Sequence, residues 1–240
     1  ENKNRIEDFA GIAKEIGSMK YEENTKGKEL MRIIDNFDDK IIVFTKYKTT
    51  IEFLEKLLKQ QGYDIAIFHG GMTRKEKENQ IEYFRKEAQV LISTEAGGEG
   101  RNLQFCNAII NYDLPWNPMA IEQRIGRIHR VGQKRDVYIF NLEAKNTIES
   151  YILDILDKKI NMFELVVGEV DMILGDLNDE NAGFDDMIMD IWASSQDKDE
   201  LNSKMDELGN KLLDMKNKYT KIKNVDEEIF GDLFKAEEDK

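Results

Sequence analysis

Short apolar, β-rich stretches alternate with longer amphipathic ones through the first 142 residues, and this alternation constrains the fold more than any other feature. The short stretches read, in chain order, DDKIIVFT, DIAIFHGG, QVLIST, NAIINYD and VYIFNL. Segments of about 10 to 15 residues with helical spacing separate several of them, and parallel strands need connections of this length. The pattern therefore predicts an α/β domain with a parallel sheet and helices on both of its faces.

Two of the helical segments carry clear local signals. The stretch YKTTIEFLEKLLKQQGY has an apolar stripe and ends at Gly62, where a C-terminal glycine cap belongs. In TRKEKENQIEYFRK, Arg74 stands four residues before Glu78, and Glu82 stands four residues before Lys86. Residues four apart are neighbours on a helix, so the second segment is expected to neutralise its own charges.

The sequence changes character after about residue 143, where the strand signals stop. NTIESYILDILDKKINMFELVV predicts a helix with a broad apolar face, GDLNDENAGFDD a turn or linker, and DELNSKMDELGNKLLDMKNKYTKIK a further amphipathic helix. We therefore expect a lobe with N-terminal helices over residues 1–145, followed by a helical C-terminal extension. This extension divides into a bracing helix over 146–176 and an acidic helical appendage over 177–240.

The formal charge of −13 is unevenly distributed along the chain. Residues 1–140 hold 23 basic and 22 acidic side chains, a balance of +1, whereas residues 141–240 hold 12 and 26, a balance of −14. The acidity belongs to the C-terminal part, so the charge of the whole chain says little about what the first part binds. The acidic helices are a candidate surface for a protein partner.

Few residues are available for disulfides or metal sites. Cys106 is the only cysteine, which excludes an intrachain disulfide, and with only His69 and His129 beside it we expect no structural zinc or other metal site. No apolar run approaches the roughly 20 residues of a membrane span, and the first residues have no signal-peptide pattern. These features predict a cytoplasmic protein without membrane contact.

The stretch MAIEQRIGRIHRV gathers arginines with little carboxylate nearby. On a helix, Gln123, Arg127 and Arg130 would share one side and isoleucines the other. No acidic residue lies three or four positions from Arg127 or Arg130. Two readings are open: a solvated basic face, or guanidinium groups that bind phosphate oxygens supplied from elsewhere.

Two segments before these arginines bear on that choice. STEAGGEGRNLQ places three glycines within four residues after a predicted strand, at the carboxyl end where open α/β sheets bind ligands. NYDLPWNP holds Trp116 between the only two prolines of the chain, Pro115 and Pro118. A stiff aromatic loop suits contact with a nucleic-acid strand, and packing of Trp116 in the core is an equally open reading.

Taken in this order, AGGEGRNLQ, DLPWNP and EQRIGRIHRVGQ resemble the C-terminal motor lobe of the Swi/Snf-type ATPases of helicase superfamily two. The resemblance covers about residues 26–145, and the EGRN wording is similar to the bacterial RapA-like branch. It implies a RecA-like fold for this part of the chain. It also implies that the full protein is an ATP-dependent helicase or translocase that moves on double-stranded DNA, with RNA the less favoured track.

The resemblance further implies roles for individual residues. The motif with the paired arginines would act on the nucleotide phosphates from the opposite lobe, through Gln123, Arg127 and Arg130. The glycine-rich motif would close on the nucleotide, through Gly98, Gly100 and Asn102. Nucleic-acid contacts would come from Thr45, Lys46, Gly71 and Thr94, to which the aromatic loop adds Trp116.

The chain lacks the other half of such a motor. No G-x-x-x-x-G-K-[ST] phosphate-binding loop occurs, so ATP with its Mg²⁺ would be bound mainly by an N-terminal RecA-like lobe of the same protein, and these residues alone should not hydrolyse ATP. Two alternatives stay open. The chain could be a non-catalytic α/β scaffold with acidic partner-binding helices, or an unrelated α/β nucleotide enzyme that acts alone.

Overall fold

The computed structural model describes residues 24–94, 103–129, 133–145, 147–159, 161–162, 169–174 and 183–238. The chain divides into two compact units, Glu1–Gly97 and Gly98–Lys240. Five strands form one sheet in the order β2-β3-β1-β4-β5. The pairs β1–β3, β2–β3 and β4–β5 are all parallel, which confirms the predicted α/β class.

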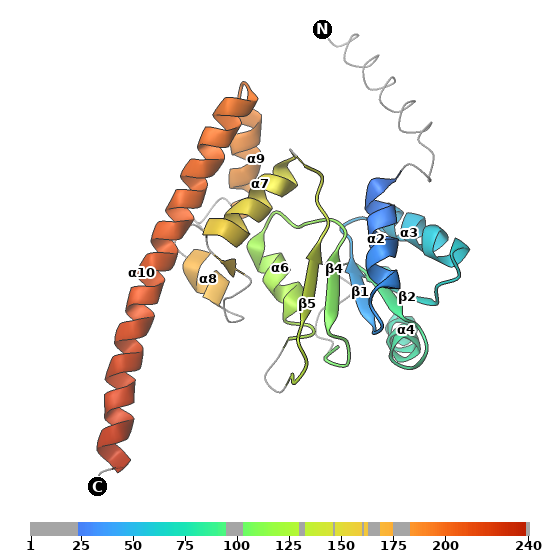
Figure 1. Ribbon diagram of the computed structural model, residues 1–240, viewed down its shortest axis with the longest axis horizontal. Helices are drawn as coiled ribbons and strands as arrows, with labels where there is room; N and C mark the ends of the chain where they lie inside the picture. Colours follow the sequence, from blue (N-terminus) through green and yellow to red (C-terminus); the bar gives the residue numbers. More distant parts are fainter. Residues whose placement is uncertain are drawn as a thin grey trace. The chain divides into compact units, whose positions relative to one another are not determined.

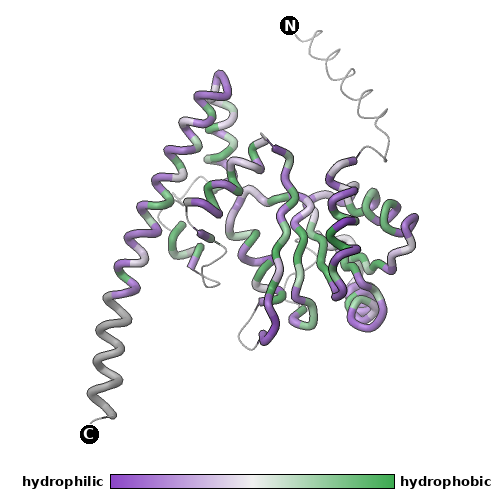
Figure 2. Tube along the Cα trace, in the orientation of Figure 1, coloured by the Kyte–Doolittle hydropathy of each residue, from purple (hydrophilic) through white to green (hydrophobic). Residues whose placement is uncertain are grey.

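The first unit contributes three strands and three helices. They are α2 (Thr25–Asp35), β1 (Ile41–Phe44), α3 (Lys48–Gln60), β2 (Ile65–Phe68), α4 (Arg74–Lys86) and β3 (Val90–Ser93). The strands are almost wholly buried, as expected for a parallel sheet with covered faces. In Figure 2, β1 appears mostly in the green of apolar residues, whereas α4 shows much of the purple of polar ones.

Both helix signals in this unit are confirmed. The helix α3 stops at Gln60, and Gly62 follows with a φ of 87°, a left-handed conformation that glycine adopts without strain. The helix α4 begins with a capping box, in which Thr73 and Glu76 each satisfy a backbone N–H of the other. Its predicted ion pairs form on the exposed surface: Arg74 Nε lies 3.0 Å from Glu78, and Lys86 Nζ lies 2.9 Å from Glu82.

The second unit contributes two strands and a set of helices. They are β4 (Ala108–Asn111), α6 (Pro118–Ile125), β5 (Tyr138–Asn141), α7 (Ile148–Asp154), a π-helical turn η2 (Ile155–Lys159), α8 (Glu169–Leu174), α9 (Phe184–Ser194) and α10 (Lys198–Glu238). The 41-residue α10 packs against α8, α9 and η2, and Figure 1 shows α8 and α9 beside it.

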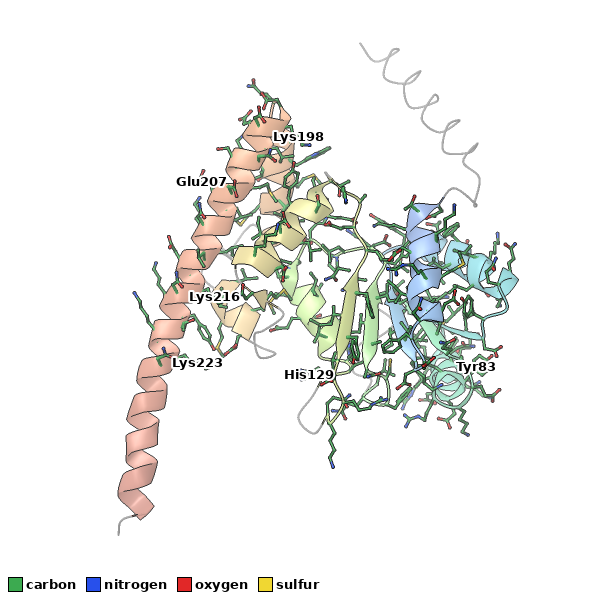
Figure 3. The ribbon with its side chains drawn as sticks, viewed as in Figure 1. Tyr83, His129, Lys198, Glu207, Lys216 and Lys223 are labelled. Atoms are coloured by element: carbon green, nitrogen blue, oxygen red, sulfur yellow. The ribbon has the colours of Figure 1, made fainter. Side chains whose placement is uncertain are left out.

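One apolar cluster joins the helices of this second unit. It includes Ile121 of α6, Ile152 and Leu156 of the α7–η2 segment, Ile188 of α9 and Leu208 of α10, all buried. An ion pair also joins α10 to α8: the Nζ of Lys223, labelled in Figure 3, lies 2.7 Å from Glu169 at the start of α8. The helices after β5 therefore pack on the segment that holds α6.

Two sequence predictions for the C-terminal part need correction or addition. The helix expected over 146–167 is not regular, because the α-helix ends at Asp154, a π-helical turn follows, and Asn161 adopts a positive φ of 45°. The helix α9 had been expected only as part of an undivided appendage. The turn expected at 175–186 lies mostly outside the described residues. So do residues 1–23 at the start of the lobe, where N-terminal helices are expected. The boundaries at 145 and 176 stay predictions.

No helix in the described part of the chain has both the length and the apolar character needed to cross a membrane.

Candidate functional site

The helix α6 is shorter than the arginine-rich stretch predicted. It starts with Pro118 at its first position, and the side chain of Asn117 caps it by accepting a hydrogen bond of 2.9 Å from the Met119 N–H. It ends at Ile125, with Gly126 as its C-cap. The continuous helix expected over 119–131 is therefore wrong. Beyond Ile125 the chain forms a tighter turn, in which the N–H of Arg127 donates to the carbonyl of Arg124 at 3.1 Å.

This turn determines where the predicted catalytic residues lie. Gln123 is exposed on the last turn of α6, and Arg127 is half-buried in the turn that follows. The flanking residues Ile121 and Ile128 are fully buried, so the predicted separation into a polar and an apolar side holds for these residues. Arg130 lies outside the described residues. The structure thus brings Gln123 and Arg127 together at the carboxyl end of α6.

The segment that follows the glycine-rich loop lies beside this turn. Gly98, Gly100 and Asn102 are outside the described residues, but the next residue, Leu103, donates its N–H to the carbonyl of Arg127 at 3.2 Å. The exit of the glycine loop and the arginine turn are therefore hydrogen-bonded neighbours. Such proximity suits two motifs that act on one ligand.

Further hydrogen bonds hold residues 103–105, the segment that follows the glycine-rich loop. Gln133 donates from Nε2 to the carbonyl of Gln104 at 3.1 Å and to that of Ile128 at 3.0 Å. Arg135 donates from Nη2 to the carbonyl of Phe105 at 2.6 Å. These side chains tie residues 103–105 to the chain that leaves the arginine turn, so the arrangement is held by bonds between distant parts of the sequence.

Arg124 has a different position from Arg127 and was not predicted as a site residue. Its side chain is 2% exposed, and its Nη1 donates to Asn111 Oδ1 at 2.7 Å and to the carbonyl of Asp113 at 3.0 Å. Asn111 is the last residue of β4 and is fully buried. A polar residue at the end of an apolar strand is the sequence signal that could have indicated this contact.

Trp116 packs against the apolar cluster of the second unit and stays half-exposed. The contact supports the core-packing reading for part of the indole. The exposed remainder leaves the predicted nucleic-acid contact as a prediction.

The other predicted nucleic-acid residues follow the strands of the first unit. Thr45 comes after β1 and Thr94 after β3, and their N–H groups donate to the carbonyls of Ser93 at 3.0 Å and Phe68 at 3.1 Å. Lys46 is exposed, with its Nζ 5.9 Å from the ring centroid of Tyr47. Since β1, β2 and β3 are parallel, these residues share the carboxyl edge of this part of the sheet.

Two of these residues have conformations that bear on their predicted roles. Thr45 is fully buried, and its hydroxyl accepts a long hydrogen bond of 3.4 Å from the Tyr47 N–H, so its side chain supports the turn after β1. Gly71 is exposed after β2, and its N–H donates to His69 Nδ1 at 3.2 Å. A Cβ at Gly71 would lie 3.3 Å from that imidazole, so a side chain there would crowd the turn.

Among the described residues, no group of three or more His, Cys, Asp or Glu side chains could hold a metal ion.

The fold and these contacts identify the class of domain. Residues 25–132 match the model of the helicase conserved C-terminal domain, and this part of the chain belongs to that family. A solved structure of the C-terminal part of the Fun30 ATPase domain superposes with a TM-score of 0.52 at 25% identity, over 65% of this chain and 54% of that one. The predicted RecA-like fold is thereby confirmed.

Bacterial relatives indicate which helicases of this class the chain resembles. It is 50% identical over 183 residues to the uncharacterized ATP-dependent helicase YqhH of Bacillus subtilis, covering 76% of this chain and 32% of that protein. It is 39% identical over 138 residues to the RNA polymerase-associated protein RapA of Vibrio campbellii, covering 56% of this chain and 14% of that protein. The predicted resemblance to Swi/Snf-type helicases of the RapA-like branch is confirmed.

Proposed function

We propose that this chain is the second motor lobe of an ATP-driven, DNA-dependent translocase. It would supply arginine fingers from Arg127 and Arg130, and contacts to the backbone of double-stranded DNA. The carrying observation is the position of Arg127, half-buried in the turn after α6 and hydrogen-bonded through its carbonyl to Leu103 at the exit of the glycine-rich loop.

The chemistry of phosphoryl transfer supports these roles. ATP with its Mg²⁺, held mainly by an N-terminal lobe of the same protein, supplies the phosphoryl group. The guanidinium groups of Arg127 and Arg130 would donate to phosphate oxygens as negative charge develops there, and an arginine finger is worth roughly 10³ to 10⁵ in rate. Gln123 is exposed beside them and would orient a phosphate or the attacking water. Gly98, Gly100 and Asn102 would close on the nucleotide.

The carboxyl edge of the first unit supports the nucleic-acid contacts. Lys46 is an exposed cation, Gly71 an exposed residue with little bulk, and Thr94 a half-buried hydroxyl, and all three follow strands at that edge. Phosphate contacts of this kind are independent of sequence, so binding should weaken as the salt concentration rises. Alternating closure and opening of two lobes around ATP would convert these contacts into movement along the duplex.

The remaining parts of the proposal concern partners and location. The relatives named above include an RNA polymerase-associated protein, and the acidic C-terminal helices of this chain would offer a surface to a protein partner. We place the complete motor in the cytoplasm.

Turnover of ATP by the complete protein tests this proposal. We expect double-stranded DNA to stimulate ATP hydrolysis, the stimulation to fall with added salt, and the 240 residues alone to show no turnover. K46A should raise the DNA concentration needed for half-maximal stimulation several-fold. K59A is the matched control, because Lys59 is also an exposed lysine but is not among the predicted nucleic-acid residues.

Hydrolysis by the 240 residues alone would contradict the proposal and favour an enzyme that acts by itself. A complete protein that hydrolyses no ATP with or without DNA would instead favour the scaffold with acidic partner-binding helices.

A further inference from the structure

Arg124 is a charged residue buried in the centre of the second unit. Its side chain is 2% exposed, and its Nη1 donates to Asn111 Oδ1 at 2.7 Å and to the carbonyl of Asp113 at 3.0 Å. Removing a guanidinium group from water is costly unless its donors are satisfied. The burial therefore has to be offset by the bonds that the group makes.

The bonds of Arg124 continue into both strands of this unit. Asn111 donates from Nδ2 to Asn141 Oδ1 at 2.7 Å, and these two asparagines are Cα partners in the parallel register of β4 and β5. Asn111 ends β4 and Asn141 ends β5. The guanidinium group thus joins the last turn of α6 to the carboxyl end of β4 directly, and to that of β5 through Asn111.

The backbone of Arg124 holds the next functional residue. The N–H of Arg127 donates to the carbonyl of Arg124 at 3.1 Å, and the carbonyl of Arg127 accepts from Leu103 at 3.2 Å. The turn that contains Arg127 is therefore attached on one side to the exit of the glycine-rich loop. On the other side it is attached to a residue whose own side chain is fixed to the sheet.

We propose that Arg124 is a positioning residue for Arg127, acting through the bonded series Arg124–Asn111–Asn141. This inference rests on the proposed function, in which Arg127 reaches the nucleotide phosphates. Transfer rates depend on placement to within about an ångström, so a group that fixes the turn contributes to turnover without touching the nucleotide. The three arginines of the motif then have two tasks: one orients the turn, and the others face the ligand.

A double-mutant cycle in the complete protein distinguishes positioning from a purely structural anchor. The variants are R124M, R127A, the double variant R124M/R127A and R124K, assayed with saturating duplex DNA well below the lowest melting temperature of the set. If Arg124 acts through Arg127, R124M should lower kcat about 10- to 100-fold and leave KM for ATP within about threefold. In the R127A background, the same change should lower kcat by less than about twofold.

The conservative variant gives a second readout. R124K keeps a positively charged donor that can serve Asn111 Oδ1 and the Asp113 carbonyl, so we expect kcat to recover to within about fivefold of the natural protein. Should R124M lack a cooperative unfolding transition, N141A breaks the series one bond away. N141A should lower kcat about threefold to tenfold, again only when Arg127 is present.

The outcomes separate this inference from the proposed function. A large loss in R127A together with an equal R124M loss in both backgrounds would overturn the positioning role alone, as would full kcat in R124M. Full kcat in R127A would overturn the proposed function and the positioning role with it.

Discussion

The helices α4 and α6 treat their arginines in opposite ways. On α4, Arg74 is highly exposed and pairs with Glu78, one helical turn further along. On α6, Arg124 is buried and bonds to neutral oxygens of Asn111 and Asp113, which lie more than ten positions before it in the sequence. The charge of the first helix is satisfied locally and in water, and that of the second by distant parts of the fold.

The difference shows that an arginine with no carboxylate nearby in the sequence can have either of two surroundings. An arginine without a carboxylate three or four positions away can face an external phosphate, or it can turn inward onto amide and carbonyl oxygens. The sequence alone gives Arg124 and Arg127 the same surroundings. The structure separates them, because Arg124 is buried on the end of β4 and Arg127 lies half-buried in the turn beyond Ile125. Figure 3 labels His129, the exposed residue two positions further on.

The largest stability effect should come from the buried arginine. R124M leaves Asn111 Oδ1 and the Asp113 carbonyl without this donor, and we expect the free energy of unfolding to fall by about 1 to 3 kcal/mol. The matched control R74A removes an exposed arginine from α4 and should cost less than about 0.5 kcal/mol. Urea unfolding of both variants measures the difference, and equal losses would remove the distinction between the helices.

We expect a smaller difference between α4 and α6 in how the stability lost on mutation depends on pH. The hydrogen bond from Lys86 holds the pKa of Glu82 below its usual value, so the pair contributes stability above the unfolded pKa, near 4.3. That contribution is lost as the pH falls through the lower folded pKa. The cost of K86A, measured by urea unfolding, should therefore be present at pH 7 and decrease as the pH falls below the unfolded pKa of about 4.3. The cost of R124M should persist over this pH range, because Asn111 Oδ1 and the Asp113 carbonyl are neutral. A K86A cost that is constant with pH would contradict this account.

Local signals explain which features could be predicted. The strands follow from short apolar runs, the end of α3 from Gly62, and the surface pairs of α4 from spacing by four, since each depends on residues close in the sequence. The family and the fold also followed from motifs in their order.

Features set by distant contacts could not be predicted in this way. The end of α6 depends on Gly126 together with the bond from Leu103 to the Arg127 carbonyl, some 24 positions apart. The inward position of Arg124 depends on Asn111 at the end of another element. For the candidate site, the sequence spacing identified the cluster of arginines. Only the fold shows that Arg124 is buried and Arg127 half-buried.

Single-turnover hydrolysis by the complete protein carrying R127A tests the central claim most directly, with DNA saturating and nucleotide affinity measured on the same samples. We predict that the affinity for ATP stays within about threefold of the natural protein while the rate of hydrolysis falls by roughly 10³ or more. An R127A rate within about threefold of the natural protein would contradict the claim that this chain completes a nucleotide site with Arg127.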